Sequence, residues 1–262
     1  MPLRTIHATR YVTPLRERGS LPAIVEADDD GTYVLKFRGA GQGIRALIAE
    51  LIVGEIARAL GLRVPELVFM QLDPVLGRAE PDPEIQELIK ASAGLNLALD
   101  YLPGSVTFDP LVPQPLLQEP ELAAAIVWLD AYTSNVDRTA RNANLLVWHQ
   151  RLWLIDHGAA LFFHHSWKDY QTRSSSPFVQ IKDHVLLPQA HALPELDAAL
   201  AAKLTPEVLG AIVDLIPADW LGDVPGLEDV AAHRQAYVDY LVRRLEGPRA
   251  FVEEAWNAHR QL

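Results

Sequence analysis

Residues 135–160 read NVDRTARNANLLVWHQRLWLIDHGAA, and they hold the most informative pattern in the chain. A polar loop leads into two short apolar runs, at 145–148 and 152–155, which predict a pair of strands joined by a tight turn. Asn142 precedes the first strand and Asp156 follows the second. Because a hairpin brings the outer ends of its two strands together, Asn142 and Asp156 are expected to face one point.

The polar residues around this hairpin predict a site that binds magnesium and transfers a phosphoryl group. An amide oxygen from Asn142 and a carboxylate from Asp156 suit Mg²⁺, which prefers oxygen ligands and keeps waters and phosphates around it. Asp137 lies in the polar loop before Asn142 and is expected to orient or deprotonate a hydroxyl group of the acceptor. Taken singly, each residue is more often a turn or cap residue, but their order along the chain favours phosphoryl transfer.

The part of the chain that precedes this segment begins with predicted strands. Asp30-Gly31 is a tight-turn signal between the second and the third strand. A helix is expected over 44–60, with Gly61 as the residue that ends it. β-Forming residues predict five strands, at residues 5–13, 22–27, 32–37, 65–72 and 95–102.

After Pro103-Gly104 the composition changes and helical patterns dominate. These patterns predict helices at residues 119–134, 195–203, 206–216, 228–245 and 248–260. The sequence therefore predicts an α+β, two-lobed fold. Residues 1–102 are expected to form a first lobe with a small antiparallel β-sheet and one long helix, and residues 103–262 a mainly α-helical second lobe.

The 135–160 segment resembles the catalytic loop and metal-binding segment of the HipA-like kinases. The likeness extends to AELIVGEIARALGLRVP at residues 49–65 and implies a kinase-like fold that uses ATP and Mg²⁺. In the family's pattern Asp137 would be the catalytic base, and Asn142 and Asp156 would bind the metal. Asn144 is a second candidate ligand. The chain departs from the family at His157, where an aromatic or aliphatic residue is usual; this leaves the metal ligands unaffected.

The resemblance also implies roles for residues of the first lobe. Lys36, in the strand TYVLKF, would hold the α- and β-phosphates of ATP, and Glu50 would fix the direction of the lysine side chain. Glu55 is the alternative partner, because it lies nearer the middle of the apolar arc of the helix. The hinge that meets adenine would be formed by Asp100, Tyr101 and Leu102.

Two glycine-bearing loops are candidates for covering the phosphates. The loop between the first two strands has the position that this loop has in kinases, and it contains Gly19 and Ser20. The loop Gly39–Gly43 is richer in glycine and opens the long helix, so its amides could bind an anion; the alternative is a flexible connection. Both assignments stay open at this stage.

The composition limits the classes of binding partner that are expected. The formal net charge is −11, so a nucleic acid is not expected, because the average field would repel its phosphates. The apolar stretches are too short to span a membrane, and neither a secretory signal nor a membrane partner is expected. Cysteine is absent, which excludes disulfides and favours a cytoplasmic location. The resemblance implies a Ser or Thr hydroxyl of a protein as the acceptor, with a small molecule as the alternative.

Two further functions are open alternatives. The strand, the Gly39–Gly43 loop and the helix occur in the order of a dinucleotide fingerprint. The third glycine is misplaced for that motif, and the acidic residue that should end a second strand is lacking. A pseudokinase that binds nucleotide without turnover is the non-catalytic alternative, and the presence of all four residues expected of an active kinase argues against it.

Overall fold

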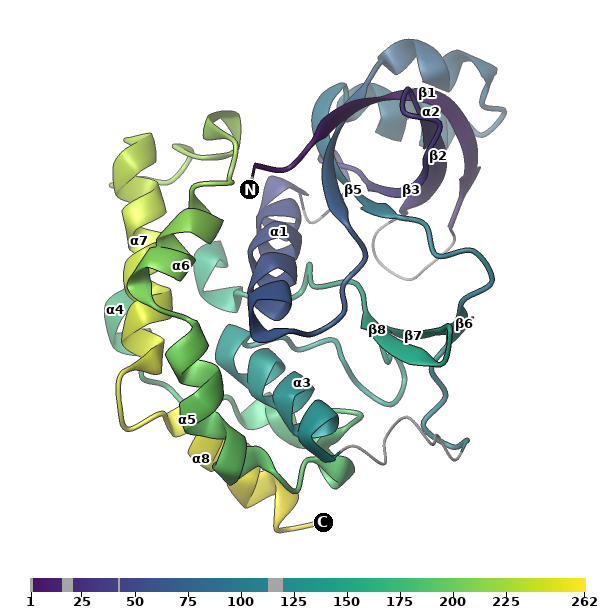
Figure 1. Cartoon of the computed structure of the whole chain (residues 1–262). Helices are drawn as coiled ribbons and strands as arrows, with labels where there is room; N and C mark the ends of the chain where they lie inside the picture. The colour runs from purple at the N-terminus through teal and green to yellow at the C-terminus, as the bar shows by residue number, and fades with distance from the viewer. Residues whose placement is uncertain (1, 16–20, 42, 113–119) are drawn as a thin grey trace. The chain divides into compact units, whose positions relative to one another are not determined.

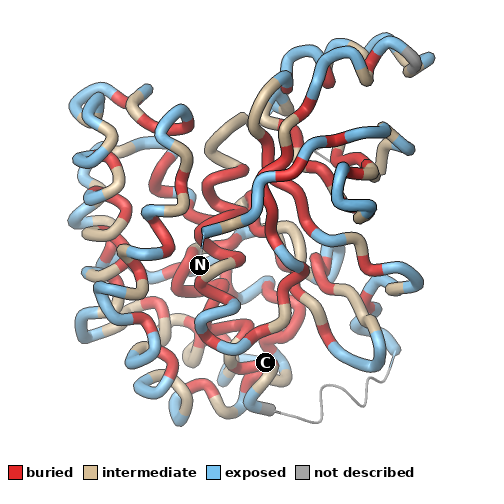
Figure 2. The backbone as a smooth tube through the Cα atoms, turned by 45° about the horizontal axis from the view of Figure 1, so that its top comes forward, coloured by how far each residue is buried: buried red, intermediate tan, exposed pale blue. Residues whose placement is uncertain are grey.

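The structure, a computed structural model, describes residues 2–15, 21–41, 43–112 and 120–262. Contacts within the chain divide it into two compact units (Figure 1). The first unit comprises residues 1–51 and 65–103, and the second comprises residues 52–64 and 104–262. Within each unit the buried stretches lie inside, while loops and outer faces are exposed (Figure 2).

A closed five-stranded barrel forms the first unit, with the strand order β1-β2-β3-β5-β4. Neighbouring strands pair antiparallel except β1 and β4, which pair parallel and close the barrel. Closure removes the free edges that an open sheet would expose. The sequence predicts these five strands but neither the parallel pair nor the closure. The strands are β1 (Thr5–Pro14), β2 (Ala23–Ala27), β3 (Thr32–Lys36), β4 (Leu67–Leu72) and β5 (Gly94–Asp100).

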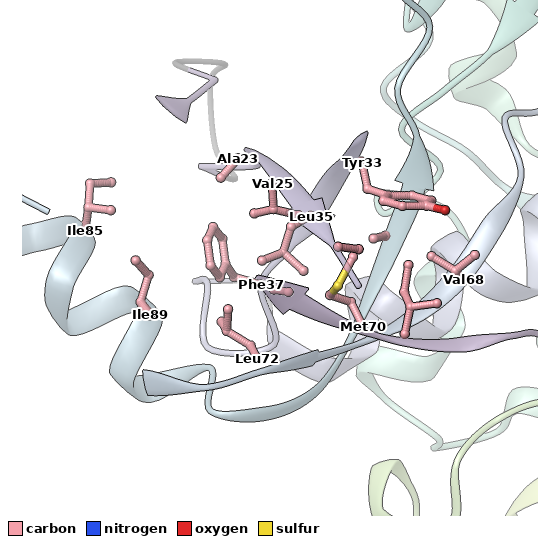
Figure 3. Close-up of a cluster of buried hydrophobic side chains, with 14 residues drawn as sticks. Ala23, Val25, Tyr33, Leu35, Phe37, Val68, Met70, Leu72, Ile85 and Ile89 are labelled. Atoms are coloured by element: carbon pink, nitrogen blue, oxygen red, sulfur yellow. The ribbon is translucent and has the colours of Figure 1, made fainter. Parts of the chain in front are cut away.

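Alternating side chains of the barrel strands point inward and build its core (Figure 3). Val25 and Leu35 are fully buried there, and Met70 of β4 packs in the same cluster. Helix α2 (Pro83–Ala91) adds the buried Ile85 and Ile89, which lie one helical turn apart. The sequence predicts neither this helix nor the preceding 3₁₀ helix η1 (Pro74–Ala79).

Helix α1, Gly43–Leu60, ends in a Schellman motif at Gly61. Gly61 has a φ of +90°, and its N–H donates to the carbonyl of Arg58 at 3.0 Å. The N–H of Leu62 donates to the carbonyl of Ala57 at 2.9 Å, which completes the motif. The prediction of a long helix that Gly61 ends is therefore confirmed.

The second unit contains a three-stranded antiparallel sheet in the order β6-β7-β8. Its strands are β6 (Val106–Thr107), β7 (Leu145–Trp148) and β8 (Arg151–Leu154). His149 and Gln150 connect β7 to β8 with φ angles of 47° and 56°, the two positive values that a two-residue type I′ hairpin turn requires. The hairpin predicted from the sequence is confirmed.

Helices make up most of the second unit, and α3 is central among them. Trp128 and Tyr132 of α3 contact Phe251 of α8, with ring centroids 5.5 and 5.7 Å apart. The α-helices are α3 (Pro120–Thr133), α4 (Tyr170–Arg173), α5 (Leu193–Lys203), α6 (Pro206–Val213), α7 (Val230–Leu245) and α8 (Ala250–His259). The 3₁₀ helices are η3 (Phe162–His165), η4 (Val179–Asp183), η5 (Leu187–Gln189) and η6 (Ala218–Trp220). Of the helices in the described ranges, none is long and apolar enough to cross a membrane.

Candidate active site

The loop between α3 and β7 carries Asp137. Helix α3 ends at Thr133, and Ser134 turns the chain with a left-handed φ of 54°. The side chain of Asn135 then fixes the loop at two points. Its Oδ1 accepts a hydrogen bond from the backbone N–H of Asp137 at 3.2 Å, and its Nδ2 donates to the buried Asp130 at 2.9 Å.

Two asparagine side chains orient the carboxylate of Asp137. Its Oδ2 accepts from Nδ2 of Asn142 at 2.8 Å and from Nδ2 of Asn144 at 3.2 Å. Backbone hydrogen bonds between Thr139 and Asn142, at 2.9 and 3.1 Å, close the loop between them. The structure therefore brings together the predicted base, Asp137, and the predicted metal ligand, Asn142.

The hairpin holds Asp156 beside this loop. Leu145 pairs with Leu154 in the strand register, and one step further out the N–H of Ile155 donates to the carbonyl of Asn144 at 3.1 Å. Asp156 follows directly, with a φ of 55°. Asn144 has a φ of 49°, so both chain ends of the hairpin use the left-handed conformation that Asn and Asp tolerate better than most residues.

A buried polar network centred on Arg138 lies beneath the loop, and its members are not among the site residues predicted from the sequence. Arg138 is 1% exposed, and its Nε donates to Oδ2 of Asp130 at 2.5 Å. Its Nη1 donates to the carbonyls of Asn144 and, at 3.4 Å, Ile155. Its Nη2 lies 3.2 Å from Nδ1 of His157. One guanidinium thus connects helix α3, both ends of the hairpin and the residue after Asp156.

The geometry of this network assigns protons to its two histidines. Arginine can only donate, so Nδ1 of His157 accepts from Arg138. Nδ1 of His184 accepts from the N–H of Leu186 at 3.0 Å, so its Nε2 carries the proton that it donates to Asp130 at 2.8 Å. Both rings are therefore neutral in this arrangement.

The electrostatics of the network agree with this assignment. Burial lowers the pKa of His184, and Asp130 opposes this effect without cancelling it. Burial alone would raise the pKa of Asp130, but Arg138 and His184 outweigh it and hold that pKa below its usual value. Asp130 is therefore a buried carboxylate that stays ionised because its neighbours compensate for the lost hydration.

The same network fixes both ends of the segment 157–184. His157 begins this segment and is bound by Arg138; His184 ends it and is bound by Asp130. The next residue, Val185, donates its N–H to the carbonyl of Arg138 at 3.0 Å. The departure from the family pattern at His157 thus has a structural reason, because the imidazole accepts a hydrogen bond that an aliphatic side chain could not.

In the first unit, Lys36 and Glu50 form an ion pair. Nζ of Lys36 lies 3.9 Å from Oε2 of Glu50, and their side chains are 11% and 2% exposed. This distance is too long for a hydrogen bond but well within range of Coulomb attraction at a buried site. The alternative partner, Glu55, instead lies 3.5 Å from Nε of Arg58, one helical turn further on.

The chain matches one protein family over most of its length. Residues 12–251 match the description HipA-like kinase. The chain belongs to the HipA-like kinase family. A comparison with curated protein sequences gave no match.

This HipA-like kinase has a kinase-like α+β fold. The solved structure that supports this is that of the Helicobacter pylori proinflammatory kinase CtkA, which is similar with a TM-score of 0.57 and 11% identity over 99% of each chain. The Golgi casein kinase, solved with Mn and ADP, matches with a TM-score of 0.46 and 13% identity over 95% of this chain and 74% of that chain. The Drosophila melanogaster PAN3 pseudokinase matches with a TM-score of 0.29 and 14% identity over 100% of this chain and 66% of that chain.

The predicted hinge of this HipA-like kinase lies at the end of β5. The N–H of Asp100 donates to the carbonyl of Glu66 at 2.9 Å, and the N–H of Tyr101 donates to the carbonyl of Thr32 at 3.0 Å. Both amides are therefore used within the barrel. A contact between this segment and adenine would have to use the carbonyls or Leu102, whose side chain is buried.

Of the two candidate phosphate loops, the structure describes most of the second, Gly39–Gly43, but not the glycine and serine of the first. Gly19 and Ser20 lie outside the described residues. Gly39 donates its N–H to Oγ of Ser92 at 3.1 Å, and a Cβ at this position would lie 2.9 Å from the same oxygen and 3.0 Å from the backbone of Ala91. Close packing thus explains why position 39 is a glycine, without any ligand.

Proposed function

We propose that this HipA-like kinase is an ATP-dependent phosphotransferase, which moves the γ-phosphate of Mg–ATP to a hydroxyl group, with a protein Ser or Thr as the preferred class of acceptor. The observation that carries the proposal is that Asn142 and Asn144 orient the carboxylate of Asp137. These asparagines precede the first strand of the hairpin, and Asp156 follows the second strand. Membership of the kinase family supports the same reaction.

The donor set around the hairpin fits Mg²⁺. Asn142 directs Nδ2 to Asp137, so its Oδ1 is the atom suited to bind a cation, and Asp156 adds a carboxylate. Mg²⁺ in phosphotransfer sites uses one or two such protein ligands and takes the rest from waters and phosphates. Among the described residues, no cluster of three or more His, Asp or Glu side chains that could hold a metal occurs.

Each residue has a separate task in the proposed reaction. Mg–ATP, when bound, would supply the phosphoryl group, and the metal would offset the phosphate charge. Lys36, directed by Glu50, would hold the phosphates, while Asn142 and Asp156 would bind the metal. Asp137 would accept the proton of the acceptor hydroxyl as its oxygen bonds to the γ-phosphorus and the bond from that phosphorus to the β–γ bridging oxygen breaks, which releases ADP.

Nucleotide binding gives the first test. Mg–ATP at about 100 times its Kd should stabilise the native protein by about 2.7 kcal/mol, because it binds the native state alone. For a chain of this size that corresponds to a rise in Tm of about 5–10 °C. The measurement is a thermal unfolding scan, with NAD as the control ligand. A rise with NAD and none with Mg–ATP would contradict the kinase proposal and favour a dinucleotide cofactor.

Transfer is tested with ATP labelled at the γ-phosphate, offered with a panel of Ser and Thr peptides and a panel of small hydroxyl compounds. Label on peptides supports the proposed acceptor class. Label on small molecules alone would replace it with the small-molecule alternative. Binding of ATP without label on either panel is the result expected of a pseudokinase.

The ion pair of the first unit gives a second prediction. Lys36→Ala and Glu50→Ala should each lower turnover, and the double variant should be little worse than either single one, because the two residues act as a unit. The measurement is kcat/KM for ATP in a double-mutant cycle. Glu55→Ala is the matched control on the same helix, since Glu55 pairs with Arg58. Coupling of Lys36 to Glu55, or additive effects at Glu50, would refute the assignment.

A further inference from the structure

A pocket of about 160 Å³ opens in the second unit beside the loop that carries Asp137. Ser134 and Val136 of this loop form part of its wall. Because consecutive Cα atoms are about 3.8 Å apart, the wall at Val136 begins one residue from the proposed base. The remainder comes from the segment 157–184 and from α7. The pocket therefore adjoins the place where the hydroxyl to be phosphorylated would lie.

Aromatic side chains form the floor of the pocket. Phe163 stacks on Tyr240, with ring centroids 3.5 Å apart and planes 14° from parallel. Both rings are buried, as is Phe178, which completes the apolar floor. Such a floor is rigid, because close-packed rings in a buried cluster have little room to move.

Two arginines, Arg173 and Arg244, lie in the wall, and Arg244 uses its donors within the protein. Arg244 is 3% exposed, and its donors bind the carbonyls of Ala131, Tyr132, Ser174 and Ser176 and Oγ of Ser134. These five bonds use all five N–H groups that a guanidinium has. Arg173 donates through Nη1 to the carbonyls of Ser166 and Lys168, at 2.6 and 3.3 Å. Arg244 therefore has no N–H group left for an anionic ligand.

Exposed apolar side chains lie in and beside the wall of the pocket, together with the exposed polar residues Ser176 and Gln180. Val136 is 41% exposed, Phe162 is 61% exposed, and Val179 is 52% exposed. Val136 and Phe162 line the pocket, and Val179 lies in the chain between two lining residues. Exposed apolar side chains that cluster around a hollow mark an interaction site, whereas isolated ones need no explanation.

We propose that this pocket binds one apolar side chain of a polypeptide acceptor, close in sequence to the Ser or Thr that is phosphorylated. The size fits, since an apolar cavity of about 150 Å³ holds a benzene-sized group, whereas sites for whole small molecules are typically about 300–1,000 Å³. An extended chain advances about 3.3 Å per residue, which places the bound side chain about one to three residues from the acceptor. This inference rests on the proposed function.

The test uses fluorescein-labelled Ser peptides in which Phe, Leu, Ala or Glu occupies each of the three positions on either side of the serine. Binding is measured by anisotropy without nucleotide, and transfer is measured with Mg–ATP. Phe or Leu at one position should lower Kd and KM by roughly tenfold relative to Ala, the scale at which apolar pockets discriminate.

Phe162→Ala should remove most of this preference, because the exposed Phe162 ring lines the pocket and would contact the bound side chain. Val75→Ala, an exposed apolar residue of the first unit, is the control and should leave the preference intact.

The outcomes separate the inference from the proposed function. Transfer without a preference at any position, or a preference for Glu, overturns the pocket assignment and leaves the kinase proposal standing. Binding with the apolar preference but no transfer supports the pocket and overturns the kinase proposal. A preference that Phe162→Ala does not change would also overturn the inference, since the side chain would then bind elsewhere.

Discussion

Asp137→Asn should lower turnover about 100-fold or more while leaving the affinity for Mg–ATP nearly intact. The loss is the usual scale for a removed general base or orienting group. The asparagine can still accept through Oδ1 from Asn142 and Asn144, so the loop geometry should survive. The substitution therefore removes a proton acceptor and little else. The measurement is a nucleotide titration together with a single-turnover rate on the same preparation.

Asp156→Asn is the matched comparison, because it makes the same change of side chain at a residue with a different proposed task. It should weaken Mg²⁺-dependent nucleotide binding and abolish transfer, since a ligand to the metal is lost and the phosphate charge is poorly offset. Loss of ATP binding in Asp137→Asn together with full activity in Asp156→Asn would reverse the two roles. Activity like that of the wild type in both variants would show that this hairpin is not the active site.

The sequence alone predicts those parts of the fold whose signal is local. Two apolar runs around His149-Gln150 predict the β7–β8 hairpin, and Gly61 predicts the end of α1 because a left-handed residue is needed there. The prediction that Asn142 and Asp156 face one point rests on the same hairpin, because a hairpin brings the outer ends of its strands together. Pairing between distant strands leaves no such signal, so the parallel pair of β1 with β4 and the closed barrel could not be predicted.

The members of the Arg138 network could not be predicted from the sequence, although the sequence contains one signal that such a network exists. Asp130 is the one charged residue in the run AAAIVWLDAYT of α3, residues 123–133, and a charge in a buried helix needs a partner. That signal indicates a buried ion pair but not its partners, because His184 lies 54 residues away and meets Asp130 only in the folded chain. The pocket beside Asp137 is likewise assembled from three distant segments.

Asp130→Asn should reduce the free energy of unfolding by about 3–5 kcal/mol, the usual cost of breaking a buried ion pair on one side. An amide cannot accept from Arg138, His184 and Asn135 together as the carboxylate does. The charge of Arg138 would then stay buried without its counter-ion. Asn135 would also lose its hydrogen bond to the carboxylate of residue 130, so Asp137 should be held less firmly in its position. Urea unfolding of the two proteins at pH 7 measures the difference.

Controls for this prediction come from the same region. Asp183→Asn makes the identical change at an exposed residue directly before His184 and should alter stability by less than about 0.5 kcal/mol. Arg138→Met should cost much less in the Asp130→Asn background than in the wild type, because the stranded charge is then removed. Additive losses, or equal effects of Asp130→Asn and Asp183→Asn, would show that the network does not stabilise the protein.

The pH dependence of stability gives this prediction a second readout. His184 and Asp130 both have a pKa in the folded protein below the usual values of 6.5 and 3.8, so the unfolded chain binds more protons as the pH falls. The wild type should therefore lose stability below about pH 6.5 as unfolded His184 takes up a proton, and again below about pH 4 for Asp130. Asp130→Asn should lack the second loss, so its urea midpoint should change less than that of the wild type between about pH 4 and 3. Parallel curves for the two proteins in that interval would mean that Asp130 is not the carboxylate that the buried network keeps ionised.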